Sequence, residues 1–357
     1  SVRQITAKKS AQSSGTMLMH FNMLYSIAQD PGGILVVMPT EDAVRKVSKL
    51  RVIPLLRLCD AIKPYMMGTA YDITNLTYDF TNMDIIYAWA NSPSAMASFP
   101  RRKVFCDEVN KFPAMSGDEA DPIALSRERM ETYWNRLLIL ASTPTLPGGP
   151  ISREYEMSDQ RTYQIRCPKC HKWQTMMWGG VKWPHKVSEV SNIIDGDPLR
   201  SVHPDEIEFF QLAWYECTQC KHKIDEQERL KLIQHGMWCP KGGTLDDKGN
   251  LTGNYRQMGH RGYWWNRMVT PMGSFPRMAK EWLECQRKPF ALMNFINSWL
   301  AEEWQEKVDD TEIKTSTTEA HPKFVVPDGA FVLFASCDVQ SSGGDHIWYE
   351  VRAWGED

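Results

Sequence analysis

The first residues that could do chemistry form a loop close to the amino terminus. The segment KKSAQSSGT, residues 8–16, has the length and the small polar composition of a phosphate-binding loop. The usual loop ends in Gly-Lys-Ser/Thr, but here Gly15 stands directly before Thr16 and the lysines come first. Thr16 could place a hydroxyl on a magnesium ion, and Lys9 is long enough to fold back across the phosphates. Taken alone, such a segment is more often an ordinary polar turn.

Two adjacent acidic residues could complete a nucleotide site with this loop. Asp107 and Glu108 close an apolar, strand-like run that Arg102 precedes. Ligands of open α/β sheets bind at the carboxyl ends of the strands, where one carboxylate could hold a metal and the other position water. A second strand-like run ends in Ser142 and Thr143, whose hydroxyls could sense a γ-phosphate or belong to a Ser-Thr-Pro turn. The loop and the acids together favour a nucleotide site.

These residues need a sheet to position them. Strand-like runs at 2–8, 32–40 and 101–109 alternate with helical patterns, the first of which covers 15–30. The segment 75–92 has the pattern of two adjacent strands. Such alternation predicts an α/β fold with a mainly parallel sheet and helices on both faces.

Four cysteines form a second candidate site. Cys167 and Cys170, and then Cys217 and Cys220, each enclose two residues, so each pair can offer two thiolates to one face of a tetrahedral ion. Four such ligands satisfy Zn²⁺ completely, which predicts a structural role. Reduced, metal-free cysteines and a redox pair are the alternatives. Nearby lysines are compatible with phosphate contact or with a solvated basic rim.

The composition limits the classes of protein. The 357 residues suit two or three globular domains, and 42% are hydrophobic. A net charge of −3 argues against a protein that coats nucleic acid through a strong basic field. The longest apolar runs are of strand length, well below the ~20 residues that span a membrane. Since the sequence starts at Ser1, without a methionine and with only one short strand before the loop, and a strand pattern begins near its end, we expect part of a longer chain.

The order of the motifs resembles one family. KSAQSSGT, VVMPTEDAVRK, ANSPSAMASFPRRKVFCDEVNKFP, ASTP and the pair CPKC and CTQC are similar to the large terminase subunits of tailed phages, of the lambda gpA-like type. The resemblance covers essentially the whole chain and implies a RecA-like, ASCE-type P-loop ATPase. It identifies the loop as a deviant Walker A motif with its lysine in front. Its ATP- and Mg²⁺-binding residues would be Lys9, Ser10, Ala11, Gln12, Ser13, Ser14, Gly15 and Thr16, with Ser14 where the family usually has glycine.

The same resemblance implies roles for the other residues. Asp107 would hold Mg²⁺ through water, Glu108 would be the catalytic carboxylate, and Ser142 and Thr143 would form a coupling motif. Arg102 would be a sensing or trans-acting arginine, or a surface arginine near phosphates or DNA.

The resemblance also implies four segments. Residues 1–161 would be the ATPase core without its upstream adenine-contacting part, and 162–240 a zinc-binding insertion with four cysteine ligands. Residues 241–322 would be a helical return to the ATPase and a linker, and 323–357 the first strands of an RNase H-like nuclease. Asp338 would be the first Mg²⁺ ligand of that nuclease, and its partner ligands would lie beyond residue 357.

The implied function is an ATP-driven motor that moves double-stranded DNA into a procapsid, with cleavage of concatemers by the nuclease. The implied partners are the small terminase subunit, the portal protein and further copies in a ring, in the host cell cytoplasm and without a membrane. Two alternatives stay open: a zinc-containing, helicase-like ATPase, and a zinc-braced scaffold with an inactive loop. The scaffold is motivated by Ser14 and by the missing lysine before Thr16.

Overall fold

The computed structural model describes residues 2–67, 76–97, 100–194, 196–305, 325–326, 328–340 and 346–355. The chain divides into two compact units, Ser1–Gln305 and Glu306–Asp357. Among the described residues of the second unit, β16 (Ala330–Gln340) and β17 (His346–Gly355) form an antiparallel pair. No helix in the described part of the chain is both long and apolar enough to cross a bilayer.

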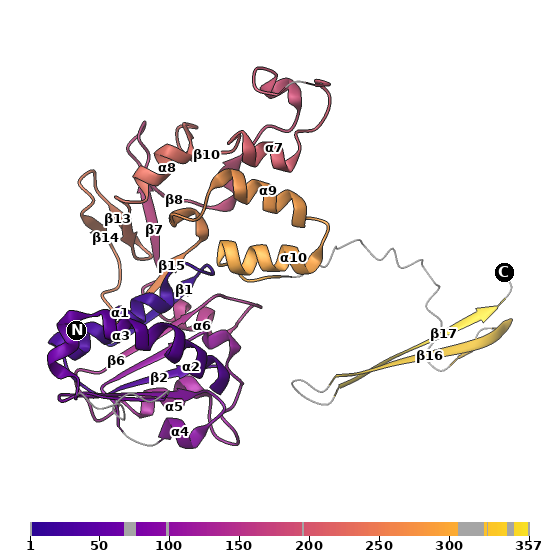
Figure 1. Ribbon diagram of the computed structural model, residues 1–357. Coiled ribbons are helices and arrows are strands. Elements are labelled where there is room, and N and C mark those ends of the chain that lie inside the picture. The colour runs from indigo at the N-terminus through magenta and orange to yellow at the C-terminus, as the bar shows by residue number, and fades with distance from the viewer. Residues whose placement is uncertain are drawn as a thin grey trace. The chain divides into compact units, whose positions relative to one another are not determined.

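The first unit is built on a ten-stranded sheet (Figure 1). Its order is β12-β7-β15-β1-β6-β5-β2-β4-β3, and β8 also pairs with β7. The strands from β7 to β4 in this order run parallel, whereas β3, β8 and β12 are antiparallel to their neighbours. The predicted mainly parallel sheet is therefore confirmed. Its strands are β1 (Gln4–Lys9), β2 (Ile34–Met38), β3 (Thr77–Asp79), β4 (Asp84–Trp89), β5 (Lys103–Asp107), β6 (Leu137–Ser142), β7 (Arg161–Arg166), β8 (Trp173–Thr175), β12 (Met237–Cys239) and β15 (His260–Trp265).

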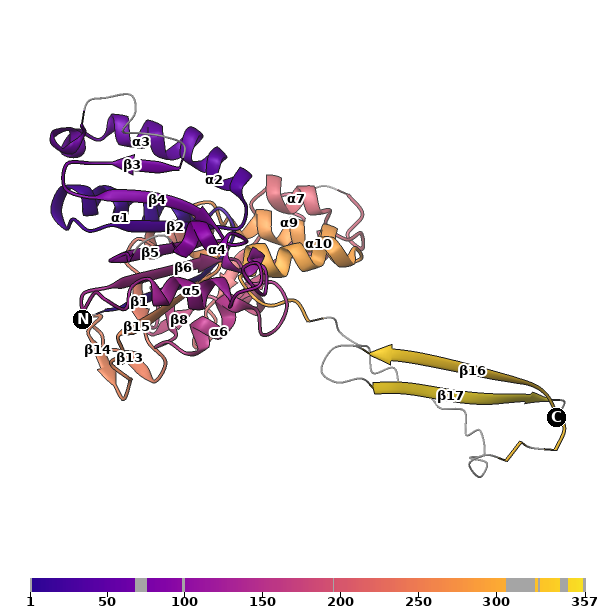
Figure 2. The ribbon, with the colours of Figure 1, turned by 90° about the horizontal axis from the view of Figure 1, so that it is seen from below.

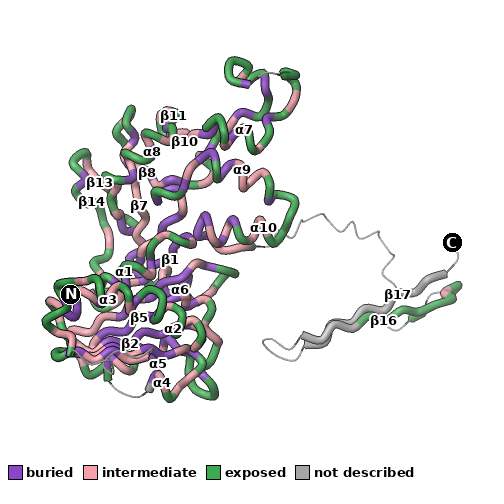
Figure 3. Tube along the Cα trace, in the orientation of Figure 1, coloured by how far each residue is buried: buried purple, intermediate pink, exposed green. Residues whose placement is uncertain are grey.

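Helices cover both faces of this sheet because its central strands are apolar on both sides (Figures 2 and 3). All five residues of β2 are buried, and alternate residues belong to different cores: Ile34 packs on one face and Leu35 on the other. The first face carries α1 (Gly15–Gln29), α2 (Glu41–Val47) and α3 (Ile53–Leu58). The second face carries α4 (Pro93–Ala97), α5 (Pro122–Glu128) and α6 (Pro150–Glu156).

The strand order brings the candidate site together. β6 lies between β1 and β5, and both pairings are parallel. Lys8 pairs with Ser142, and Asp107 pairs with Ala141, so the three strands end close together. The loop after β1, the acids after β5 and the tip of β6 therefore meet at one edge of the sheet.

The carboxyl-terminal half of this unit returns to the same sheet. β15 lies between β1 and β7, so residues 260–265 pair directly with residues 4–9. The predicted boundary at residue 162 falls inside β7, and β12 pairs with β7 as well. The segment 162–240 thus shares strands with the ATPase sheet. Within the predicted return at 241–322, helical structure is present as α9 (Phe275–Cys285), α10 (Pro289–Asn294) and a π-helical end, Phe295–Leu300.

A third hydrophobic core lies between this return and the cysteine-containing segment. It includes Tyr215, Phe275 and Phe295, all fully buried. The surrounding elements are β9 (Val181–Lys182), α7 (Pro204–Phe209), β10 (Trp214–Glu216), β11 (Lys223–Ile224) and α8 (Glu226–Leu232). The hairpin of β13 (Gly243–Leu245) and β14 (Leu251–Gly253) lies next to β12.

Candidate nucleotide site and cysteine cluster

Lys9 reaches the loop from its front end. It is the last residue of β1, and its side chain is almost completely buried. The side chain passes over Gly15: a Cβ added to Gly15 would lie 2.4 Å from both Cδ and Cε of Lys9. The space beside position 15 is therefore occupied by the lysine that arrives from position 9. This packing accounts for the glycine that stands where the usual loop has its lysine.

The loop backbone is shaped for close approach of a ligand. Gln12 and Ser14 have positive φ angles of 53° and 64°, in the left-handed region that few residues other than glycine adopt. Ser14 precedes α1 without capping it through its side chain. The first N–H groups of a helix have no partner within the helix, so those of α1 are suited to bind an anion. The loop is fixed by N–H donation from Ser10 to the Trp265 carbonyl and from Ala11 to the Ser298 carbonyl, at 3.0 and 2.7 Å.

Thr16 and Asp107 are in direct contact. The Thr16 hydroxyl donates to Oδ2 of Asp107 at 2.6 Å, and the Glu108 N–H donates to Oδ1 at 3.1 Å. Burial raises the pKa of Asp107, although the Thr16 hydrogen bond and the positive charge of Lys9 oppose that shift. A buried carboxylate that lacks a full counter-charge fits a divalent cation. Thr16 and Asp107 could therefore hold Mg²⁺ between them.

Glu108 lies at the end of β5 in a strained conformation. Its φ is 58°, and a non-glycine residue there costs on the order of 1–3 kcal/mol. Its carboxylate is 3.9 Å from Nζ of Lys9 and 3.1 Å from Nζ of Lys111. The Lys9–Glu108 and Thr16–Asp107 contacts bring the side chains of these four residues together at the end of β5. Their roles in nucleotide chemistry stay predictions.

The tip of β6 is tied to the turn that follows Glu108. Ser142 is fully buried, and its hydroxyl donates to the Thr143 carbonyl and accepts from the Asn110 N–H. Asn110 also donates to the Thr145 hydroxyl at 3.0 Å and accepts from the Ile151 N–H at 2.8 Å. Ser142 thus links the two strand ends through the backbone. Asn110 therefore connects the turn after Glu108 to the tip of β6 and to α6, and we did not predict this role. Its position two residues after the acids was the only sequence feature that pointed to it.

His20 is a second residue that sequence reasoning missed. It lies one helical turn after Thr16, and a cavity of about 10 Å³ is lined by Thr16, His20, Tyr87 and Asp107 among others. Burial, with a smaller effect of Arg51, lowers the pKa of His20 to about 4. Its imidazole is therefore neutral at physiological pH and adds no charge beside Asp107.

Arg102 is not brought to this site. It precedes β5, and the acids follow β5, so the whole strand separates them. Its guanidinium is 2.7 Å from a carboxylate oxygen of Asp30 and donates to the Pro31 carbonyl at 2.9 Å. Arg102 therefore cannot contact the nucleotide site of its own chain, and the sensing role expected of it there is wrong. It ties the end of α1 to the opposite edge of the sheet.

The four cysteines form one cluster, and their sulfur atoms lie within 4.8 Å of one another. The two pairs have the same geometry: the N–H groups of His171 and Lys221 donate to the carbonyls of Cys167 and Cys217, and both donors have a φ of 59°. Sulfur atoms around tetrahedral Zn²⁺ are about 3.8 Å apart, given a Zn–S bond of about 2.3 Å. The Cys167–Cys220 and Cys170–Cys217 sulfur distances are 3.7 and 3.8 Å. The cluster therefore fits a zinc ion.

Asp338 belongs to β16, where it pairs with Trp348. Its side chain lies outside the described residues, and its role as a nuclease ligand stays a prediction.

Comparison with known proteins gives two family matches. Residues 1–238 match the model of the phage terminase large subunit gpA, ATPase domain. Residues 260–357 match the model of the terminase large subunit gpA, endonuclease domain. The second match begins at β15, a strand that belongs to the sheet of the first unit.

The chain is also similar to individual proteins. The large terminase subunit of Escherichia phage lambda is 23% identical over 374 residues, which cover 99% of this chain and 54% of the relative. The large terminase subunit of Enterobacteria phage P21 is 21% identical over 365 residues, with the same coverage. The large terminase ATPase domain of Thermus phage P74-26 has a TM-score of 0.35 and 14% identity, over 44% of this chain and 66% of that chain.

The chain thus spans about half the length of the curated relatives that it matches, 54% in each case. The ATPase-domain match covers well over half of the chain and includes Lys9, Thr16, Asp107 and Glu108. The chain belongs to the family of phage terminase large subunits of the gpA type.

Proposed function

We propose that this chain hydrolyses ATP to drive double-stranded DNA into a phage procapsid. The observation that carries the proposal is the contact between Thr16 and Asp107 in a site that Lys9 and Glu108 complete. A buried ammonium group, a hydroxyl at the start of a helix and two adjacent carboxylates are the groups that phosphoryl transfer requires. The family match supports the assignment to genome packaging.

The geometry suggests how the residues divide the work. Lys9 and the N–H groups of the loop would bind the β- and γ-phosphates, while Thr16 and Asp107 would hold Mg²⁺. Bound Mg²⁺ would neutralise charge on the phosphate oxygens. Nζ of Lys9 lies 3.9 Å from the carboxylate of Glu108. Lys111, whose side chain is mostly exposed, forms a second ion pair with the same carboxylate. Phosphates would replace Glu108 as the partner of Lys9, which would free that carboxylate to orient the attacking water.

Ser142 and Thr143 would transmit the state of this site. Thr145, in the same loop, accepts the N–H of Trp304 through its carbonyl at 2.9 Å. Residues 301–305 precede the second unit along the chain. A change at the acids could therefore reach that segment through Asn110 and Thr145.

The remaining assignments rest on the family. Concatemer cleavage would belong to the nuclease that includes Asp338, with Mg²⁺ as its metal. The small terminase subunit, the portal protein and further copies of this chain would be partners in the host cytoplasm. The zinc cluster would be structural because four thiolates leave no ligand position open.

The convergence of Lys9 with the acids favours a working loop over the inactive scaffold, since a scaffold has no need for a buried ammonium group at this position. The helicase-like alternative shares this site. An assay for strand separation tests it, because a packaging motor is expected to move intact duplex without unwinding it.

The decisive experiment is Glu108→Gln in the complete large subunit. We expect ATP binding to persist and phosphate release to fall roughly 10²- to 10⁴-fold, the usual effect of removing a group that activates the nucleophile. Glu128→Gln is the matched control, because Glu128 is an exposed residue at the end of α5. Unchanged hydrolysis in Glu108→Gln would contradict the catalytic assignment.

A further inference from the structure

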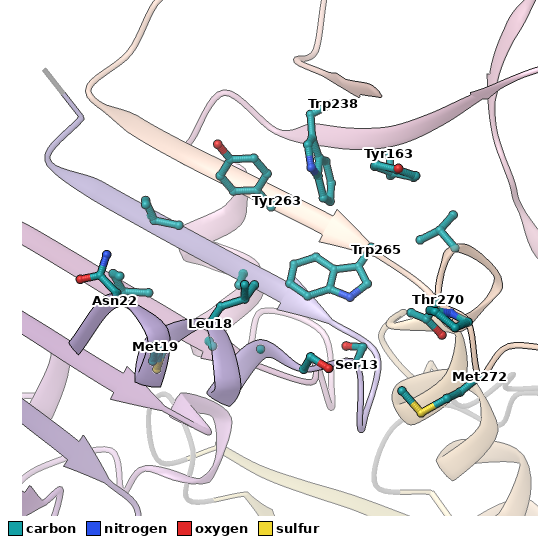
Figure 4. Close-up of a pocket in the computed structure, with 18 residues that line it drawn as sticks. Ser13, Leu18, Met19, Asn22, Tyr163, Trp238, Tyr263, Trp265, Thr270 and Met272 are labelled. Atoms are coloured by element: carbon teal, nitrogen blue, oxygen red, sulfur yellow. The ribbon is translucent and has the colours of Figure 1, made fainter. Parts of the chain in front are cut away.

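Two cavities of very different size lie against α1. The larger, of about 590 Å³, lies between α1 and the rings of Tyr263, Trp265 and Trp238, and we call it the aromatic cavity (Figure 4). None of the described side chains that line it is charged. The smaller cavity, of about 10 Å³, shares Met19 with the aromatic cavity but also reaches Asp107. Of the two, the smaller cavity therefore contacts the carboxylate that is expected to hold Mg²⁺.

His20 lies on the same face of α1 as Thr16, because side chains four residues apart in a helix lie one above the other. Both line the smaller cavity together with Asp107. His20 is 4% exposed, and its Nδ1 atom is buried without a hydrogen-bond partner in the described part of the chain. A buried polar atom without a partner costs about 1–3 kcal/mol. The imidazole therefore needs a partner that the protein itself does not supply.

Tyr87 approaches the smaller cavity from the other side of β2. Val36 of β2 pairs with Tyr87 of β4 and with Phe105 of β5, so these three side chains point to one face of the sheet. Asp107 follows Phe105 by two positions and points the same way. Tyr87 is 2% exposed, and within the described residues its hydroxyl donates only to the sulfur of Met23, at 3.7 Å. A thioether is a weak acceptor, so this hydroxyl also lacks a good partner.

The size and the lining of the smaller cavity suit one water molecule. A buried water needs a cavity of about 10–15 Å³ and two to four polar partners. His20, Tyr87 and Asp107 can supply three. A neutral imidazole has one nitrogen that donates and one that accepts, and a tyrosine hydroxyl can do both. Water can therefore satisfy the two groups that lack good partners and still donate to the carboxylate.

We propose that His20 and Tyr87 hold one water molecule against Asp107, and that this water orients the carboxylate for Mg²⁺. The proposal rests on the proposed ATPase function, because it concerns the Mg²⁺ that Thr16 and Asp107 would hold. Asp107 already accepts from the Thr16 hydroxyl and from the Glu108 N–H. The water adds a hydrogen bond from the cavity side. His20 and Tyr87 are positioning residues, since they act on the cation through Asp107.

The test measures Mg²⁺ affinity and does not depend on turnover. ADP binding to the full chain is followed by calorimetry at buffered concentrations of free Mg²⁺, and again in EDTA. We expect His20→Leu and Tyr87→Phe each to raise the half-saturating Mg²⁺ concentration roughly 10- to 100-fold, and to change ADP affinity in EDTA less than about twofold, because groups that orient a metal ligand set metal affinity. His20→Asn should restore most of the loss, since its amide places a polar atom close to the position of Nδ1.

A double variant tests whether the two residues share one water. His20→Leu combined with Tyr87→Phe should be no weaker than the weaker single variant, because either change already removes the water. Tyr25→Phe and His235→Leu are the matched controls, since Tyr25 is 58% exposed on the same helix and His235 is exposed. Both controls should need the same Mg²⁺ concentration as the unmodified chain.

The outcomes distinguish the two proposals. An unchanged Mg²⁺ requirement in His20→Leu and Tyr87→Phe would overturn the positioning role and leave the ATPase site standing. Additive losses in the double variant would overturn the shared water. If His20→Leu does not fold, Tyr87→Phe decides, because it removes a single oxygen atom. ADP binding by the unmodified chain that does not respond to Mg²⁺ would instead overturn the proposed ATPase function.

Discussion

The side chain of Lys9 occupies the space that any side chain at position 15 would need. A Cβ on Gly15 would be 2.4 Å from two carbon atoms of Lys9, far inside van der Waals contact. The two residues therefore depend on each other. A lysine that enters from the front of the loop leaves space only for a residue without a side chain at position 15.

Gly15→Ala should consequently disable the site as Lys9→Ala does. The added methyl would displace the lysine stem, and the loss of one charge-assisted contact costs about 1.5–3 kcal/mol. Tripolyphosphate binding should therefore weaken roughly 10- to 100-fold in both variants. Gly179→Ala is the control, since a Cβ there meets nothing within 4 Å. Unchanged binding in Gly15→Ala would show that the lysine has another route.

Asp107→Asn should stabilise the metal-free protein at neutral pH. Burial raises the pKa of Asp107, so the folded state retains a proton that the unfolded state has lost. The ionised group therefore opposes folding above its usual pKa of 3.8, and stability falls as the pH rises through the raised value.

Urea denaturation at several pH values checks this expectation. The free energy of unfolding of Asp107→Asn should exceed that of the unmodified chain at pH 7, and the difference should shrink towards pH 4. MgATP should stabilise the unmodified chain but not the variant. A constant difference across this pH range would contradict the assignment to Asp107.

Removal of zinc should unfold the cysteine-containing segment. Structural zinc contributes about 10–16 kcal/mol of apparent binding free energy at neutral pH, more than most domains have in total stability. Cys217→Ser should therefore lose the metal and the cooperative thermal transition of this segment. Elemental analysis should find about one zinc ion per chain. Cys59→Ser, outside the cluster, should retain both properties. A metal-free, stably folded protein would refute the zinc assignment.

Two ion pairs with the same nitrogen–oxygen distance should contribute differently to the free energy of unfolding, because one is buried and the other is exposed. Arg229–Glu226 and Arg45–Glu41 both have a nitrogen–oxygen distance of 2.6 Å, but Arg229 is buried and Arg45 is exposed. Arg229→Met should lower the free energy of unfolding by about 3 kcal/mol, because it removes one partner of a buried network. Arg45→Met should cost no more than about 0.5 kcal/mol. Similar values in denaturant titrations would contradict this difference.

The sequence was sufficient for features that depend on short segments. The apolar runs that became β2, β5 and β6 were visible because a strand buried on both faces is mostly hydrophobic. The cysteine spacing predicted the cluster, since two knuckles of this length suit a tetrahedral ion. The order of motifs was enough to indicate the family.

Contacts between distant segments could not be obtained in this way. The pairing of residues 260–265 with residues 4–9 could not be predicted from either segment, because the sequence of a parallel strand does not indicate which strand lies beside it. That pairing places Trp265 beside Lys9 and creates the aromatic cavity. The role of Asn110 also depends on a turn and a strand tip that meet only in the folded sheet.

The sequence by itself determined which groups could bind phosphate, magnesium and zinc, because those chemistries are properties of residue types at short spacings. Only the tertiary structure decided which of them meet. It placed Arg102 at the opposite edge of the sheet from Asp107, although the two are five positions apart in the chain, because an extended strand separates its ends by about 3.3 Å per residue. It brought Lys9 and Trp265 together because β-sheet pairing is set by global packing.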